Sequence, residues 1–138
     1  MNWVYAQENR IYTIILTKVK NALKSKYPDI NFTLDPEPDD TSTHFPSVYI
    51  HFLPSSEKGQ TLDASGVNAI YSTIEIQVTS SKTQGQTVAR EVIWEVVDKL
   101  HSMKYEITYS PEIVPTGNDT NQCVCRMRRI LGANDTIG

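Results

Sequence analysis

Residues 68–80, NAIYSTIEIQVTS, carry the clearest secondary-structure signal in the chain. Apolar and polar residues alternate along this stretch, as is typical of a strand with one face in the core. The two faces hold Ile70, Ile74, Ile76 and Val78 on one side, and Tyr71, Thr73, Glu75 and Gln77 on the other. The stretch therefore predicts a sheet with one apolar face and one polar face.

Amphipathic helices are predicted on both sides of this strand. Residues 5–27 repeat apolar side chains at helical spacing, and Pro28 ends the segment because a residue before proline disfavours α geometry. A second helix is predicted at 83–103, where Ser81 and Gln84 have the spacing of a capping box. The predicted dry faces are Ile11, Ile15, Val19, Leu23 and Tyr27 on the first helix, and Ala89, Ile93, Val96, Leu100 and Met103 on the second.

Shorter strands and polar loops account for the remaining segments. Strands are predicted at 30–34, 47–52, 105–110 and 121–131, and polar loops at 35–43, 54–66 and 111–119. The order α-β-β-β-α-β-β predicts an α+β fold, with two helices packed on one face of a small, mainly antiparallel sheet. A helix between two strands also allows one parallel crossover. No repeat or linker divides the chain, so residues 1–138 are expected to form a single domain.

Composition limits the classes of function. The 138 residues are 39% hydrophobic and 21% charged, which predicts a folded globular protein. A net charge of −3 is unlike the basic domains that bind nucleic acid through their whole surface. No apolar run approaches the roughly 20 residues of a membrane helix, and the N-terminus lacks the pattern of a signal peptide. Folding in a cytoplasm, without membrane contact, is the expectation.

The two cysteines allow two interpretations. Cys123 and Cys125 are two residues apart in a predicted strand, so both point to the same face. A structural zinc site needs four ligands, yet His44, His51 and His101 show no pairing at ligand spacing. The favoured interpretation is a reduced, buried pair, and half of a metal site is the alternative. No metal and no cofactor are expected.

Three arginines follow the cysteines. Arg126 and Arg128 point away from the cysteine face, whereas Arg129 shares it. They could form a solvated face, a phosphate-binding patch or a salt-bridged contact with another protein. No aromatic residue interleaves them and no glycine-rich loop precedes a helix, which disfavours phosphate binding. The acids that a neighbouring copy could offer them are Asp35, Glu37, Asp39 and Asp40.

Catalysis is not expected. No arrangement of nucleophile, base and orienting residue is visible, and no phosphate-binding loop or dinucleotide fingerprint occurs. The adjacent carboxylates Asp39 and Asp40 are interpreted as a solvated loop tip. Trp94, beside the dry face of the second helix, either covers a sheet edge or forms a subunit contact, where tryptophan is enriched.

Three segments taken together resemble a known family. They are FPSVYIHF (45–52), GVNAIYSTIEIQVTSSKTQGQTVAREVIWEVVDKLHSMKYEI (66–107) and RMRRILGANDTI (126–137). In order and character they resemble the tail terminator proteins of long-tailed bacteriophages, also called tail completion or minor capsid proteins. The resemblance covers residues 45–137, and the N-terminal helix fits it in position. It includes no catalytic signature, so no residue role is transferred from the family.

The resemblance implies a structural protein of the virion. Such a protein forms a hexameric ring that caps the tail tube, stops addition of the major tail protein and joins the head connector, with DNA leaving through the lumen. Assembly would take place in the host bacterial cytoplasm, and the final location would be the neck at the top of the tail. The alternatives are a neighbouring head-closure or stopper protein and, less favoured, a small metal-binding domain.

Patterning alone also suggests which residues contact subunits or partners. The two loops at 35–43 and 54–66, the exposed side of the second helix and the arginine cluster are the expected positions. The candidates are Asp35, Glu37, Asp39, Asp40, Glu57, Lys58, Trp94, Arg126, Arg128 and Arg129.

Overall fold

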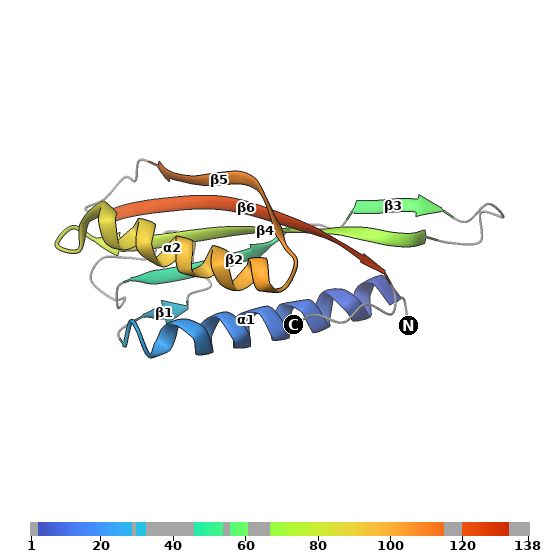
Figure 1. The fold of residues 1–138 in the computed structure, drawn as a ribbon, viewed down its shortest axis with the longest axis horizontal. Coiled ribbons are helices and arrows are strands. Elements are labelled where there is room, and N and C mark those ends of the chain that lie inside the picture. Colours follow the sequence, from blue (N-terminus) through green and yellow to red (C-terminus); the bar gives the residue numbers. More distant parts are fainter. Residues whose placement is uncertain are drawn as a thin grey trace.

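The computed structural model describes residues 3–28, 30–32, 46–53, 56–60, 67–114 and 120–132 (Figure 1). The described residues form α1 (Trp3–Lys24), β1 (Asn31–Phe32), β2 (Ser47–Phe52), β3 (Ser56–Gln60), β4 (Val67–Ser81), α2 (Gly85–Ser102), β5 (Glu106–Val114) and β6 (Thr120–Gly132). The fold is α+β with a mainly antiparallel sheet, as predicted. The order contains one strand more than predicted, because β3 lies in a segment that was expected to be a loop.

β4 is the central strand of the sheet. The sheet order is β1-β2-β4-β6-β5, and β3 also pairs with β4. β6 accompanies β4 over most of its length, from Ala69 opposite Gly132 to Ser81 opposite Thr120. The predicted alternation is confirmed, since the apolar face of β4 is completely buried. Its buried apolar residues are Ile70, Ile74, Ile76 and Val78.

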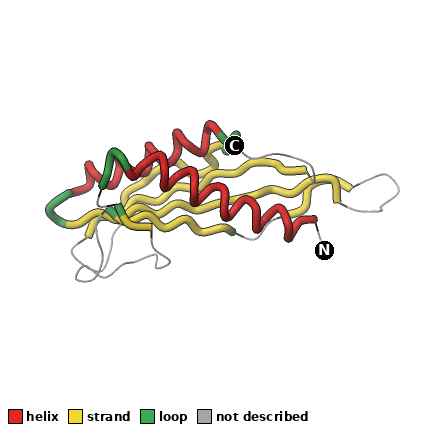
Figure 2. Tube along the Cα trace, turned by 90° about the horizontal axis from the view of Figure 1, so that it is seen from below, coloured by secondary structure: helices red, strands yellow, loops and turns green. Residues whose placement is uncertain are grey.

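Both helices cover the same face of the sheet (Figures 1 and 2). α2 lies against β4, β5 and β6, and α1 packs beside α2. The dry faces predicted for the helices are buried, except that Tyr27 is only half-buried. Burying a large aliphatic side chain contributes roughly 1.5–3 kcal/mol, so this apolar layer is the main source of stability. Neither described helix combines the length and the apolarity needed to span a bilayer.

β3 corrects the prediction of a loop at 54–66. It continues along the same edge of β4 as β2, but the register shifts by one residue, since Phe52 faces Ile74 and Ser56 faces Tyr71. One extra residue therefore lies on the β2–β3 side, as at a β-bulge. The sequence of β3, SEKGQ, lacks apolar alternation, and its strand geometry comes from backbone pairing with β4.

Residues 56–60 of β3 pair with residues 67–71 of β4, and this paired segment is called here the β3–β4 arm. In Figure 1 this arm extends past the end of α2. Its base is fixed to the first helix, because the buried Gln7 side chain donates a hydrogen bond from Nε2 to the Gly132 carbonyl oxygen at 2.8 Å. Gly132 lies opposite Ala69 of the arm, so α1 and the arm are joined through the end of β6.

The connection through α2 is a crossover. β4 and β5 are both antiparallel to β6, which lies between them, so β4 and β5 run in the same direction. The predicted parallel crossover is therefore present with one strand inserted. A second parallel relation joins β1 to β2, where Asn31 faces Ser47. Of the strand predicted at 30–34, Asn31–Phe32 is confirmed, and residues 33–34 lie outside the described part of the chain.

The reciprocal hydrogen bonds predicted between Ser81 and Gln84 are present, but they lie before α2. The Ser81 amide donates to Gln84 Oε1 at 3.2 Å, and the Gln84 amide donates to Ser81 Oγ at 3.3 Å. These bonds close the turn before Gly85 instead of the first turn of the helix. Gly85 has φ of 77°, a left-handed conformation that glycine adopts without strain.

β5 is longer than predicted. A loop was expected from residue 111, but the strand continues from Pro111 through Val114. β5 is the terminal strand of the sheet order, a position at which proline is tolerated. Two register shifts also interrupt its pairing with β6. Proline and irregular register both limit pairing of an edge with other chains.

The cysteines lie in the core. Cys123 and Cys125 are 1% and 0% exposed, beneath the helical layer. Burial raises the pKa of Cys125 to about 12, with smaller contributions from Cys123 and Glu75. Within the described residues, no three metal-binding side chains come together. This placement agrees with the interpretation of a buried, reduced pair.

We expect both thiols to be unreactive in the native protein. Burial raises the pKa of both thiols above the ordinary value of about 8.5, so both stay protonated at a pH near 8, and neither is accessible to reagent. Titration with a chromogenic disulfide should label the cysteines only after denaturant is added. Rapid labelling of the folded protein would contradict the described core.

Candidate interaction surface

The face of the sheet opposite the helices is covered by no described element. This surface, called here the open sheet face, is built from alternate residues of β2, β4 and β6 together with part of β5. Its members are Tyr49, His51, Tyr71, Thr73, Glu75, Gln77, Glu106, Tyr109, Glu112, Val124, Arg126, Arg128 and Ile130. Two of the arginines predicted at an interface, Arg126 and Arg128, therefore lie on this surface.

A row of four side chains crosses the middle of this face. His51 faces Glu75, Glu75 faces Arg126, and Arg126 faces Tyr109 on four adjacent strands. Arg126 Nε donates to Glu75 Oε2 at 2.8 Å. The Tyr109 hydroxyl donates to the carboxylate of Glu112 on the same strand. The row thus has an ion pair in its centre, and Tyr109 at its end is hydrogen-bonded to Glu112 outside the row.

Glu75 is held in its ionised form. Partial burial opposes ionisation, but hydrogen bonds from Gln77 and Arg126, with the charges of Arg126 and His51, outweigh this effect and lower its pKa. Gln77 Nε2 donates to Glu75 Oε1 at 2.7 Å, so both carboxylate oxygens accept a hydrogen bond. The ionised carboxylate is therefore the charged acceptor of Arg126 on this surface.

Aromatic side chains flank the row. The Arg128 guanidinium lies over the Tyr71 ring, 4.5 Å from its centroid, in a cation–π arrangement. On β2, the rings of Tyr49 and His51 stack with centroids 5.8 Å apart. Protein interfaces are enriched in tyrosine and arginine of this kind. The mixture is more typical of a protein contact than of a purely solvated face.

The charges on the open sheet face largely balance. Arg126 is paired with Glu75, and Arg128 faces Glu106 across β6 and β5. A surface that binds nucleic acid carries an excess of positive charge, because it must neutralise phosphates. The balance on this face favours a protein partner.

The predicted arginines separate into two groups. Arg126 and Arg128 lie on the open sheet face, whereas Arg129 lies on the side of the helices. Arg129 Nη1 donates to the Met103 carbonyl oxygen at 2.9 Å, where the last carbonyls of α2 lack helical partners. A cation also interacts favourably with the negative end of the helix dipole. The structure thus gives Arg129 a contact within the chain.

The other predicted positions are not brought together with the arginines. Trp94 is 43% exposed on α2, on the opposite layer, beside a shallow groove that Lys26 and Glu91 also line. Glu57 and Lys58 lie on the arm, opposite Ile70 and Ala69, and their side chains are not described. The acids Asp35, Glu37, Asp39 and Asp40 lie outside the described residues.

Sequence reasoning missed the role of Tyr109. Alternation along β5 would place Tyr109 on the same face as Ile107, which faces the buried Met127. A register shift between these two residues instead brings Tyr109 opposite Arg126, where its side chain is 46% exposed. Thr108 and Pro111 lie in the irregular part of the strand, and proline was the one sequence signal there.

No protein-family model matches the chain, and no curated protein matches it either.

We expect the pKa of Glu75 to depend on Arg126. The Arg126→Gln variant should raise it, because an ion pair and a charge-assisted hydrogen bond are lost. Stability from this pair is present above about pH 4.3, the ordinary glutamate pKa, and is lost as the pH falls through the lowered pKa. Since the pair is partly exposed, its removal should destabilise folding by only about 0.2–1 kcal/mol.

Carbon-detected NMR of the Glu75 carboxyl group across a pH series would measure this shift. Arg128→Gln is the matched control, because Arg128 faces Thr73 and contacts Tyr71. Equal shifts in both variants would mean that the ion pair does not set the pKa of Glu75.

Proposed function

We propose that this protein is a tail terminator of a long-tailed bacteriophage, which caps the tail tube as a ring. The observation that carries the proposal is the open sheet face: a broad, charge-balanced surface with exposed tyrosine, arginine and isoleucine side chains. The resemblance in sequence across residues 45–137 points to the same family. Both features fit a protein that acts by covering another surface.

The physical mechanism is closure of an open interface. The end of a growing tube presents an unsatisfied heterologous surface that continues to recruit subunits. A different protein that covers this surface without reproducing it stops growth. The open sheet face and the β3–β4 arm supply two different surfaces on one subunit, as a head-to-tail ring requires.

The proposed partners are the major tail tube protein, the head connector and further copies of this chain in a hexamer. DNA would leave the head through the lumen of the ring. The net charge of −3 and the balanced arginines support passage of DNA without tight binding. The site of action would be the neck of the virion, after assembly in the host bacterial cytoplasm.

Charge reversal on the open sheet face tests the proposal. Arg128→Glu should remove the cation–π contact with Tyr71 and place a new carboxylate opposite that of Glu106, where the two negative charges repel. Tubes of major tail protein should then grow without a limit on length. Lys18→Glu is the matched control, because Lys18 is exposed on α1 and the charge change is the same.

Negative-stain images of tubes assembled with each variant give the readout. The proposal predicts capped tubes of limited length with wild type and with Lys18→Glu, and uncapped tubes with Arg128→Glu. A wild-type protein that leaves tube length unregulated would contradict it. Docking on purified connector without any tube, together with no effect on tube length, would indicate a head-closure or stopper protein instead.

A further inference from the structure

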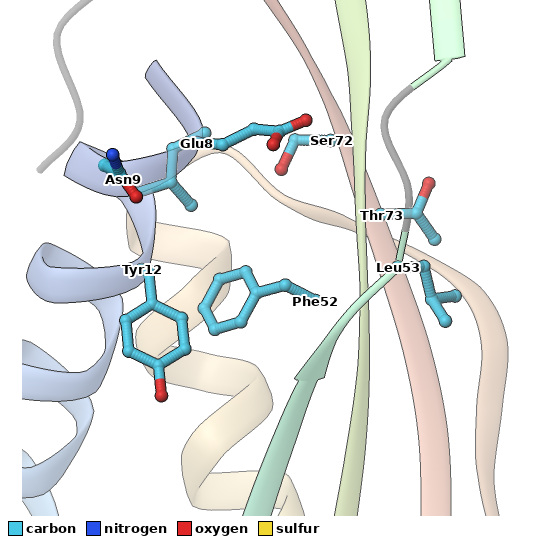
Figure 3. Close-up of a pocket in the computed structure, with 8 residues that line it drawn as sticks. Glu8, Asn9, Tyr12, Phe52, Leu53, Ser72 and Thr73 are labelled. Carbon is cyan, nitrogen blue, oxygen red and sulfur yellow. The ribbon is translucent and has the colours of Figure 1, made fainter. Parts of the chain in front are cut away.

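A pocket of about 280 Å³ lies between α1 and the sheet, at the point where β2 ends. Figure 3 shows that α1, β2 and β4, together with Leu53 after β2, supply the lining, with α1 on the left and β4 across from it on the right. The lining residues are Glu8, Asn9, Ile11, Tyr12, Phe52, Leu53, Ser72 and Thr73. None of them belongs to the row of side chains that crosses the open sheet face.

The volume limits the ligand. Sites for drug-sized molecules and cofactors usually measure about 300–1,000 Å³. A pocket of about 280 Å³ is therefore small for a nucleotide and suits one long side chain. The pocket lies near the base of the β3–β4 arm, since Leu53 follows β2 and its amide donates a hydrogen bond to the Thr73 carbonyl oxygen at 3.0 Å.

The wall of the pocket is aromatic. The rings of Tyr12 and Phe52 have centroids 4.9 Å apart and are inclined at 47° (Figure 3). Tyr12 is 42% exposed, so part of its ring remains available to a ligand. Deeper in the pocket, the Ser72 hydroxyl is already hydrogen-bonded to the Tyr105 hydroxyl at 2.8 Å. The interior thus offers apolar contact, and the Ser72 hydroxyl already has a hydrogen-bond partner within the chain.

A carboxylate also lines the pocket. The Glu8 side chain extends toward Ser72 across the pocket in Figure 3. Glu8 has no cationic partner within the described part of the chain. A carboxylate next to exposed aromatic rings matches arginine in particular, because a planar guanidinium can pair with the carboxylate and stack on a ring. An ammonium group lacks this planar geometry.

We propose that this pocket receives an arginine side chain from a partner protein, with the guanidinium at Glu8 and the apolar stem against Tyr12 and Phe52. We assign the arginine to a different protein, because four of the chain's five arginines, Arg10, Arg126, Arg128 and Arg129, already have contacts within the chain. The fifth, Arg90, lines the groove beside Trp94 on α2 and is the arginine through which a second copy could bind. The proposal does not depend on tail termination, since it rests on the pocket alone.

The test uses a pair of isosteric probes. N-acetyl-arginine amide carries the charge, and N-acetyl-citrulline amide replaces the guanidinium with a neutral urea of the same shape. Saturation-transfer difference NMR with the full chain reports binding of small probes to a protein of any oligomeric size. The arginine probe should bind roughly two- to fivefold more tightly than citrulline, the ratio expected for an exposed ion pair.

Variants locate the site. Glu8→Gln should reduce binding of the arginine probe to the citrulline level, because only the charge is removed. Tyr12→Ala should weaken both probes, since the aromatic wall is lost. Glu91→Gln is the matched control: Glu91 is exposed on α2 outside this pocket and should leave both affinities unchanged.

Equal binding of the two probes would overturn the proposal, and so would full retention of arginine binding by Glu8→Gln. Self-association that Glu8→Gln abolishes would overturn the assignment to a different protein, since a second copy would then fill the pocket. None of these results involves Arg128, so they are distinguishable from failure of the tail-capping experiment.

Discussion

The structure depends on burial of one face of β4. Ile70, Ile74, Ile76 and Val78 alternate along this strand, and each is completely buried under the helices. Because side chains of a strand alternate between faces, the residues between them must point to the opposite side. The same constraint that builds the core therefore creates the polar open sheet face. A helical layer on one side and an uncovered surface on the other follow from it.

The register of the pairing between β4 and β6 determines which side chains of the open sheet face are neighbours. Glu75 meets Arg126 because Ile76 is opposite Cys125 and Ile74 is opposite Met127, and all four of these neighbours are buried. A slip of one residue would exchange the apolar and polar faces of β6, so burial holds the register. The ion pair and the cation–π contact of Arg128 with Tyr71 are thus consequences of packing on the other face. Burial of the core therefore sets which residues face one another on the open sheet face.

Sequence predicts the parts of the fold whose pattern is local. Alternation of apolar and polar residues predicts β2, β4 and β6, and helical spacing predicts both helices. Alternation along β6 also places Arg126 and Arg128 on the face of the strand that the cysteines do not share. β3 could not be found in this way, because its residues lack apolar alternation and its strand geometry comes from pairing with β4. Tyr109 faces Arg126 only after a register shift, which alternation does not predict.

The contacts between distant segments could not be predicted from the sequence either. Arg129 binds the Met103 carbonyl because the end of α2 lies over β6, a relation set by packing. The pocket at Glu8 exists only where α1 meets the end of β2 and the middle of β4. The spacing of residues within a single segment does not determine contacts of this kind. Interaction residues that face away from the core could be placed on the correct face, but their partners could not be named.

The central claim is that assembly covers the open sheet face. Hydroxyl-radical footprinting with mass spectrometry measures this directly, since Tyr109 on that face and Trp94 on the helical layer have similar exposures of 46% and 43%. Comparing the free protein with the protein bound to the proposed partner, a tail tube, should show Tyr109 protected and Trp94 little changed. A Tyr109 side chain that stays fully reactive in the assembly would contradict the account.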